Sequence, residues 1–496
     1  MKKYLFLIIS IPLFTNCFSQ SNLWYITRGL STDEVAWAVD VDTSGNIYWA
    51  VEEKDQWPYW YYNIIMFKID SNAQQVWQST SWGGTYNDIA FKATVKDSNV
   101  YLSGRIDSTG TPISGDAFVS SYDINDGSFN WLYHFEPLPD YGYEEIDGLL
   151  VQPDGIYITG WTQSQNTNDL DFLIQKIDFS GQQLWSDTWD YDSLGKFDGA
   201  NGHMAMDDHY IYAAGHANRT NISTFDGDGV LACFDRSNGA YQWHVTWGGS
   251  LYDDALGMTM SSDSMLYVVG YTGSYGNGSQ AYVNKYSRSG QLKWSRLWGG
   301  TGAEITRSAV TDGDSIIYIA GTTSSYGNGV NDIFVLKYDS AGTLIDSLFW
   351  GGPYDEVAHD VARHGYYLYI TGDTKSFGNG QINGDHKADG LLLKVNGRTM
   401  QSPDTTITQV QEIQNPENNF SVYPNPFNIS TTIKLDRETE NGQLAIYTIF
   451  GQVIKKIIVS GDKIKIERKN LCQGIYFYEL RLNNKNISMG KLIITD

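Results

Sequence analysis

The sequence predicts an all-β protein whose main part, residues 22–402, is a seven-bladed β-propeller. A strand that contains a tyrosine and usually ends in glycine recurs seven times. Aromatic residues make up 14% of the chain and glycines number 50, whereas charged residues are only 18%, which is typical of short strands joined by tight turns. No helical spacing of 3.6 residues appears inside the repeat.

The repeated tyrosines lie 51 to 56 residues apart, a period that indicates a four-stranded unit. Each unit begins with an acidic position, continues into a first strand such as 36–41, and turns tightly into the tyrosine strand. A longer loop, a third strand and a fourth strand that usually bears a tryptophan complete it. The seven tyrosines are Tyr48, Tyr101, Tyr157, Tyr212, Tyr267, Tyr318 and Tyr369.

The ends of the array predict a closed ring. The seventh unit stops after its third strand, at 391–395. The missing fourth strand lies at the start of the chain, where Trp24 is followed by Gly29 and Glu34 at the offsets seen after Trp294. We expect this strand to complete the last blade, because an open sheet edge exposes unpaired backbone groups.

The first twenty residues have the three parts of a secretory signal peptide: Lys2 and Lys3, an apolar run over 4–14, and a polar stretch before a cleavage site. A lipoprotein signal acylated at Cys17 is the alternative, although Asn16 stands where such signals have a small residue. No later segment approaches the ~18 apolar residues of a membrane-spanning helix. We therefore expect a secreted protein without a transmembrane segment.

Several units share further motifs. They contain Trp-Gly-Gly, then an acid, a (V/I)Y(V/I)xG-like strand and an Asp-Ala-Phe-Val-like strand; Trp-Gly-Gly stands at 82–84, 247–249, 298–300 and 350–352. With these motifs the array resembles the bacterial β-propeller repeats called SBBP repeats. The Asp-turn-Gly-turn-Trp segments at 123–131, 178–185 and 235–243 are also similar to quinoprotein-like repeats, a packing motif that does not by itself imply a quinone.

The composition changes sharply near the C-terminus. Residues 403–418 are polar and aperiodic, so we interpret them as a linker. From residue 419 onward eleven Lys and Arg stand against seven Asp and Glu, whereas the mature chain before it has twenty-one against fifty, a net charge of −29. The two parts are therefore expected to have different roles.

The tail, 419–496, carries its own motifs: Tyr-Pro-Asn-Pro-Phe at 423–427, Leu-Ala-Ile-Tyr at 444–447 and Gly-Ile-Tyr-Phe-Tyr at 474–478. Strands separated by Pro, Gly and Asn predict a small immunoglobulin-like β-sandwich. In motif order the tail resembles the type A C-terminal sorting domain of type IX secretion; an unrelated immunoglobulin-like module is the alternative. The resemblance implies the type IX secretion machinery as a partner, export across the outer membrane of a Gram-negative bacterium, removal of the tag, and release or surface attachment.

One acidic residue recurs 12 to 14 residues before each repeated tyrosine: Glu34, Asp88, Glu145, Asp198, Asp254, Glu304 and Glu356. Seven carboxylates around a channel could hold a cation or a basic ligand. A symmetric feature usually maintains a symmetric fold, so we favour a structural role in which each accepts backbone N–H groups at its own blade junction.

The loop after the first tyrosine strand is rich in aromatic residues, unlike the same loop in the other blades. Ring closure would bring it beside the long loop of the seventh unit, which predicts a composite cleft for a ligand. The alternative is that its rings pack on their own blade. The ligand-binding candidates are Trp57, Tyr59, Trp60, Tyr61, Glu53, Asp385 and His386.

Other chemistry finds little support. His203, His209 and His216 cluster in the fourth unit, but without a zinc-binding spacing. We find no nucleophile elbow or dinucleotide loop, expect neither a cofactor nor a metal, and exclude nucleic acid as a partner because of the strong negative charge.

Together these features favour a monomeric, non-enzymatic propeller that binds or adheres to a glycan or a surface protein. The alternative is a polysaccharide-degrading enzyme, similar to a glycosidase, that uses acids on the channel face.

Overall fold

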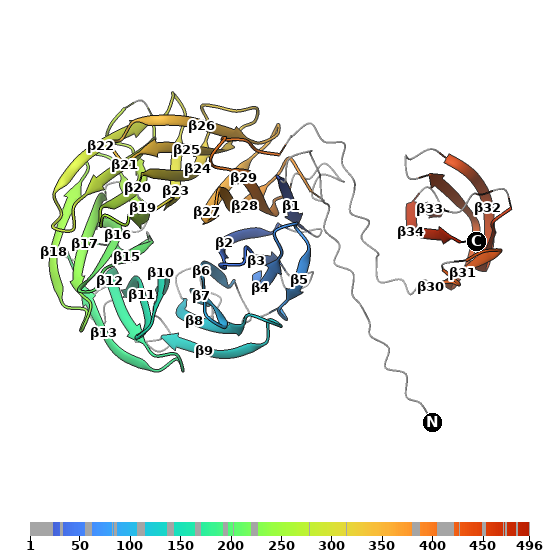
Figure 1. The fold of residues 1–496 in the computed structure, drawn as a ribbon, viewed down its shortest axis with the longest axis horizontal. Helices are drawn as coiled ribbons and strands as arrows, with labels where there is room; N and C mark the ends of the chain where they lie inside the picture. Colours follow the sequence, from blue (N-terminus) through green and yellow to red (C-terminus); the bar gives the residue numbers. More distant parts are fainter. Residues whose placement is uncertain are drawn as a thin grey trace. The chain divides into compact units, whose positions relative to one another are not determined.

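The computed structural model describes residues 23–403 and 421–495, apart from short gaps (Figure 1). The gaps are 30–32, 55–61, 82, 84–86, 107–114, 136–142, 164–169, 192–196, 202, 220–226, 277, 314, 379–386, 426, 449–452, 470, 472–473 and 483–484. The predicted signal peptide, 1–20, and residues 404–418 of the predicted linker lie outside the described residues. The chain divides into two compact units, 1–411 and 412–496.

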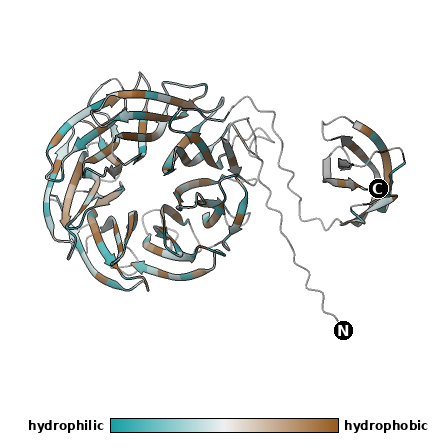
Figure 2. Cartoon of the chain, in the orientation of Figure 1, coloured by the Kyte–Doolittle hydropathy of each residue, from teal (hydrophilic) through white to brown (hydrophobic). Residues whose placement is uncertain are grey.

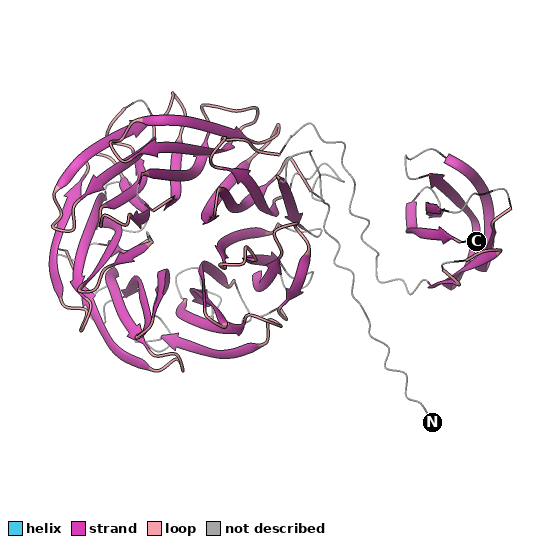
Figure 3. Ribbon diagram, viewed as in Figure 1, coloured by secondary structure: helices cyan, strands magenta, loops and turns pink. Residues whose placement is uncertain are grey.

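In the first unit, the described residues form seven antiparallel sheets around a common centre, and every regular element is a strand (Figure 3). The prediction of an all-β propeller is thereby confirmed.

The first three sheets each run in chain order from the centre outward. Their strands are β2 (Val35–Val41), β3 (Ile47–Lys54), β4 (Tyr62–Ile69), β5 (Gln75–Gln78); β6 (Ile89–Lys96), β7 (Asn99–Ile106), β8 (Asp116–Asp123), β9 (Phe129–Phe135); β10 (Glu144–Gln152), β11 (Gly155–Gln163), β12 (Leu170–Ile177) and β13 (Gln183–Trp189).

The fourth sheet differs because its inner strand is broken into β14 and β15, both paired with β16. The fourth to sixth sheets contain β14 (Phe197–Gly199), β15 (Met204–Met206), β16 (Tyr210–Arg219), β17 (Asp228–Asp235), β18 (Tyr241–Trp247); β19 (Asp253–Met260), β20 (Leu266–Thr272), β21 (Gln280–Tyr286), β22 (Leu292–Trp298); β23 (Glu304–Thr311), β24 (Ile316–Thr323), β25 (Asp332–Asp339) and β26 (Leu344–Trp350).

The seventh sheet closes the ring with both ends of the array. Its strands are β27 (Glu356–His364), β28 (Tyr367–Thr374), β29 (Asp389–Asn396) and, outermost, β1 (Trp24–Arg28). β1 pairs antiparallel with β29, with Ile26 opposite Leu392. The innermost strand of each sheet contacts the next, and β27 contacts β2, so the ring of inner strands is continuous.

Apolar side chains fill the space between neighbouring sheets, and Figure 2 shows the brown segments concentrated along the strands. The repeated tyrosines are buried there. Five of them carry a lysine ammonium from the facing third strand 4.8 to 5.8 Å from the ring centre, close enough for a cation–π contact. Tyrosine therefore recurs because it fills the sheet interface and also covers a lysine.

The second unit contains β30 (Ser421–Tyr423), β31 (Ser430–Thr448), β32 (Val453–Glu467), β33 (Gly474–Leu482) and β34 (Lys485–Ile494). These strands form one hydrogen-bonded network rather than two separate sheets, because the long β31 pairs with β30, β32 and β33. Register shifts within β31 separate its two halves, and side chains such as Ile433, Leu444 and Leu480 form its core.

Removal of residues 21–29 should destabilise the propeller and promote self-association. The deletion takes away the buried side chains of Trp24 and Ile26 and leaves β29 as an exposed edge. Light scattering and thermal unfolding of the purified variant check this. An unchanged melting temperature in a monomeric variant would contradict the closure of the ring by β1.

Candidate functional site

Each inner strand has a buried carboxylate at or next to its start, which we call the junction acid. Glu356 shows its contacts: the carboxylate accepts the Gly352 N–H at 2.6 Å and the Ser376 N–H at 2.9 Å. Glu304 likewise accepts the Gly300 N–H at 3.0 Å. The junction acid therefore ties the loop that arrives from the preceding sheet to its own sheet.

In two sheets the junction acid is the residue immediately before the one that the sequence spacing predicted. In the third and fifth sheets Glu144 and Asp253 hold the junction position, since their N–H groups each donate to a carbonyl of the preceding sheet at 2.7 Å, as Glu304 does at 2.8 Å. The sequence spacing had assigned this position to Glu145 and Asp254 instead. Those two carboxylates occupy the next position along the strand, which is apolar in the first, second, sixth and seventh sheets.

Two residues further on, the inner strands bulge. In six sheets one residue of the inner strand has no partner in the ladder, and we call it the bulge residue. In the fourth sheet Asn201, in the break between β14 and β15, takes its place. The bulge residues are Trp37, Phe91, Asp147, Leu256, Arg307 and His359.

The glycine that ends the tyrosine strand permits the bulge. A Cβ atom on Gly160 would lie 1.8 Å from the Glu145 carbonyl oxygen, and one on Gly372 would lie 1.8 Å from the Val357 carbonyl oxygen. At these positions a side chain would push the inner strand away. The Tyr-x-x-Gly pattern therefore accompanies the bulge in the other bulged sheets, whereas in the first sheet Val51 takes the place of the glycine and the bulge at Trp37 is still formed.

All six bulge residues and Asn201 line one cavity of about 380 Å³, which we call the channel-mouth pocket. Glu145 and Asp254, the residues next to the junction acids, line it as well, together with His203 and Tyr252. Residues from all seven sheets thus meet at one place, although more than 300 positions separate the first from the last.

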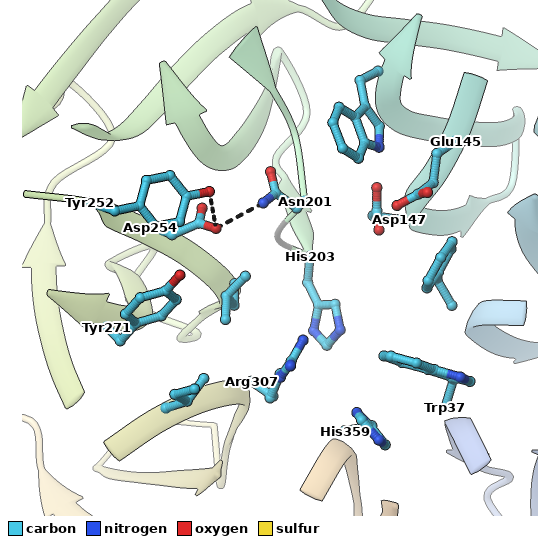
Figure 4. Close-up of a pocket in the computed structure, with 14 residues that line it drawn as sticks. Trp37, Glu145, Asp147, Asn201, His203, Tyr252, Asp254, Tyr271, Arg307 and His359 are labelled. Carbon is cyan, nitrogen blue, oxygen red and sulfur yellow. Dashed lines mark hydrogen bonds between the residues drawn. The ribbon is translucent and has the colours of Figure 1, made fainter. Parts of the chain in front are cut away.

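One side of the pocket is acidic (Figure 4). Asp254 accepts hydrogen bonds from the Asn201 amide and the Tyr252 hydroxyl, both at 2.9 Å. Glu145 forms an ion pair with Arg105 at 3.1 Å. Burial, and then the neighbouring Glu145 carboxylate, raise the pKa of Asp147 well above its usual range.

The opposite side carries the nitrogen-bearing groups (Figure 4). Arg307 has no ion pair or hydrogen bond with the part of the chain that the structure describes, and although burial lowers its pKa it remains charged. His359 is held by Asp373 at 2.9 Å and stacks near Trp37 with ring centres 4.0 Å apart. Burial lowers the pKa of His359, so Arg307 is the cation of this side at neutral pH.

A charged cluster lies next to the pocket around His203. Asp360 accepts from Lys92 at 2.8 Å and from the Ser308 hydroxyl at 2.7 Å, and its carboxylate is 3.6 Å from His203. Burial, and then the Lys92 charge, lower the pKa of His203 to about 4, which keeps this ring neutral. A second cavity of about 320 Å³ follows, lined by Lys92 and by methionines such as Met204 and Met258.

Most of the predicted cleft cannot be placed. Trp57, Tyr59, Trp60, Tyr61, Asp385 and His386 lie outside the described residues. Glu53 lies near the end of β3, where its carboxylate pairs with Arg28.

Sequence reasoning missed the channel-mouth pocket. The signal was present as the position three residues after each junction acid, where the seven units carry Trp, Phe, Asp, Asn, Leu, Arg and His. Every unit has an acid at the junction position, but the residue three positions later differs in every unit. Such variation indicates that the fold of the repeat does not depend on the side chain at this position.

Within the described ranges, no group of three or more His, Cys, Asp or Glu side chains is arranged to hold a metal ion. The same residues include no helix with the length and apolar character that crossing a membrane requires.

Comparison with known proteins identifies the tail. Residues 421–495 match the family described as "Secretion system C-terminal sorting domain". The tail is thus a type IX sorting domain, and the chain is a cargo that this system exports to the cell surface or the medium. A comparison with curated proteins found no match.

Among solved structures, the chain is similar to one described in work on PorZ, an essential surface component of the type IX secretion system of Porphyromonas gingivalis. The alignment has 10% identity and a TM-score of 0.26, and covers 95% of this chain and 75% of that one. This likeness is too distant to indicate a shared function.

Asp147→Asn should stabilise the protein increasingly as pH rises from about 4, the ordinary pKa of an aspartate, into the neutral range. A carboxyl group whose pKa is raised by folding contributes stability below its unfolded pKa, and this contribution is lost as pH rises toward the native pKa. The asparagine side chain does not ionise, so the variant does not lose stability in this way as pH rises. The charges of Glu145, Asp254 and Arg105, which face Asp147, are unchanged in the variant. Melting temperatures across this range measure the effect, with the exposed Asp208→Asn as control; equal shifts in both variants would contradict it.

Proposed function

We propose that the exported protein is a non-enzymatic binding or adhesion propeller whose ligand occupies the channel-mouth pocket. In this proposal residues 1–20 are a cleaved signal peptide, 403–418 a linker and 419–496 a tag that is removed during export. The mature propeller, residues 22–402, then acts in the medium or on the outer-membrane surface.

One observation carries the proposal: the bulge recurs at the same position in six sheets and a strand break takes its place in the fourth, yet the side chains at this position differ in all seven. Residues that only maintain a repeat tend to be the same in every blade, as the junction acids are. Aromatic, acidic, basic and amide groups gathered in one concave site are instead typical of a pocket that orients a small ligand.

The junction acids, in contrast, are proposed to be structural braces. The carboxylates of Glu304, Glu356 and Asp253 accept backbone N–H groups of their own junctions. This use of the carboxylate supports the bracing role over a ring-shaped cation site.

The aromatic loop with Trp57 and Trp60 stays part of the proposal as a second contact. In the sequence this loop follows β3, and Glu52 near the end of β3 corresponds in register to Trp161 and Tyr271, which line the pocket in other sheets. A glycan or surface protein held there could insert one small group into the pocket.

An enzymatic function is the second candidate, and the pair Glu145 and Asp147 favours it. Two neighbouring carboxyl groups, one with a raised pKa, resemble the acid and base of a hydrolase. Glu145→Gln should then abolish any polysaccharide hydrolysis by the purified propeller, whereas a binding protein shows none to abolish.

For the binding function, Arg307→Met should weaken retention of the protein on its ligand about tenfold or more, because a charge-assisted hydrogen bond is lost. Glycan arrays and small-molecule libraries, followed by calorimetry, supply the measurement. Arg288→Met, at an exposed ion pair with Asp207, is the matched control. A ligand that binds both variants as well as the native protein does not use the pocket.

For export, a chain that stops after Ser402 should fold but remain in the periplasm, since the sorting domain lies in a separate compact unit. Protease resistance and cell fractionation measure the two properties. Residues 403–496 fused to an unrelated periplasmic protein should be exported. Appearance of the truncated chain in the medium would show that the tail is dispensable.

A further inference from the structure

We infer that the channel-mouth pocket takes a small zwitterion, a molecule that carries a primary ammonium group and a carboxylate, such as a free α-amino acid or the end group of a short peptide. This inference rests on the proposed binding function and specifies its ligand class.

The acidic side offers two acceptors without donors. Asn201 Oδ1 and Asp254 Oδ1 are buried and have no hydrogen-bond partner. They come from two consecutive sheets and line the same pocket (Figure 4). A buried acceptor that lacks a donor destabilises the fold, so two such oxygens at one place indicate a missing donor group.

The positions of these oxygens are set by their surroundings. Asp254 Oδ2 accepts the hydrogen bonds from both the Asn201 amide and the Tyr252 hydroxyl, so Asp254 Oδ1 receives neither of them. The Nδ1 atom of the buried His216 is 3.6 Å from this Oδ1, beyond hydrogen-bond distance. Because Asn201 donates its amide nitrogen to Asp254, its oxygen also remains without a partner.

An ammonium group matches this arrangement. It has three N–H donors and no acceptor, whereas a hydroxyl group offers a single donor. The carboxylate of Asp254, nine-tenths or more buried, adds a charge attraction that a neutral donor would not exploit.

Arg307 supplies the opposite half of the recognition. Its guanidinium has no ion pair or hydrogen bond within the described part of the chain, so its five N–H donors are available to a ligand. Planar, bidentate contact with a carboxylate is the geometry that this group favours. With His203 and His359 neutral, no other cation of the pocket competes for the carboxylate.

The size and the remaining walls limit the ligand. The volume of about 380 Å³ is at the lower end of small-molecule sites. Trp37 and Phe91, with ring centres 5.7 Å apart, give the pocket an apolar wall that would receive an amino-acid side chain. A neutral sugar would leave both the acceptor oxygens and the guanidinium without charged partners.

The test measures binding of the twenty common L-amino acids, one at a time, to the full mature chain by thermal shift and calorimetry. The best of them is then compared with its N-acetyl derivative, which lacks the ammonium, and its methyl ester, which lacks the carboxylate. We expect each blocked derivative to bind about tenfold or more weakly.

The variants test whether the ammonium group of the ligand binds at Asp254 and its carboxylate at Arg307. Arg307→Met should bind the amino acid and its ester equally, and Asp254→Asn should lose the preference over the N-acetyl derivative. If Asp254→Asn fails to fold, Asn201→Leu tests the same side, because it removes the other acceptor that lacks a donor. Arg288→Met should behave as the native protein does.

The outcomes separate the two proposals. If no amino acid binds while a neutral glycan binds in a way that depends on Arg307, the zwitterion is wrong and the binding function stands. If a bound amino acid loses no affinity on N-acetylation, the ammonium site is wrong. If no ligand of any class depends on Arg307, both proposals fail.

Discussion

The antiparallel pairing of β1 with β29 is the constraint on which the rest of the propeller depends. Each sheet packs only on its two neighbours, so the ring holds together when the last blade is complete and can pack against the first. Strand Trp24–Arg28 supplies that missing edge from the opposite end of the array. The channel-mouth pocket exists because this closure brings Trp37 of the first sheet next to His359 of the last.

Within the ring, two positions that lie three residues apart on the inner strand have different surroundings. The junction acid accepts backbone N–H groups and is carboxylate in every sheet. Three residues later the bulge residue, or Asn201 in the fourth sheet, lines the channel-mouth pocket. A repeat can therefore diverge at the bulge without loss of packing, and a symmetric scaffold acquires an asymmetric site.

The pocket also concentrates features that a purely structural core would avoid. Asp147 is buried with a raised pKa, Arg307 is a cation without an ion-pair partner among the described residues, and Asp254 leaves one oxygen without a donor. Buried polar groups of this kind lower stability unless a ligand completes them. Backbone N–H contacts of the junction acids Asp253, Glu304 and Glu356 hold the loops next to the pocket in place.

The sequence by itself determined three features, because each has a local pattern. The repeated tyrosine strands follow a fixed period, and the N-terminal strand that completes the seventh sheet carries the Trp-to-acid spacing of a fourth strand. The sorting tail has its own set of turn motifs. Only the tertiary structure decided which of two adjacent acids, Glu144 or Glu145, faces the junction. Side chains alternate along a strand, so a shift of one residue reverses the face, and composition cannot report it. The pocket was equally hidden, since its residues come from seven sheets and meet only when the ring closes.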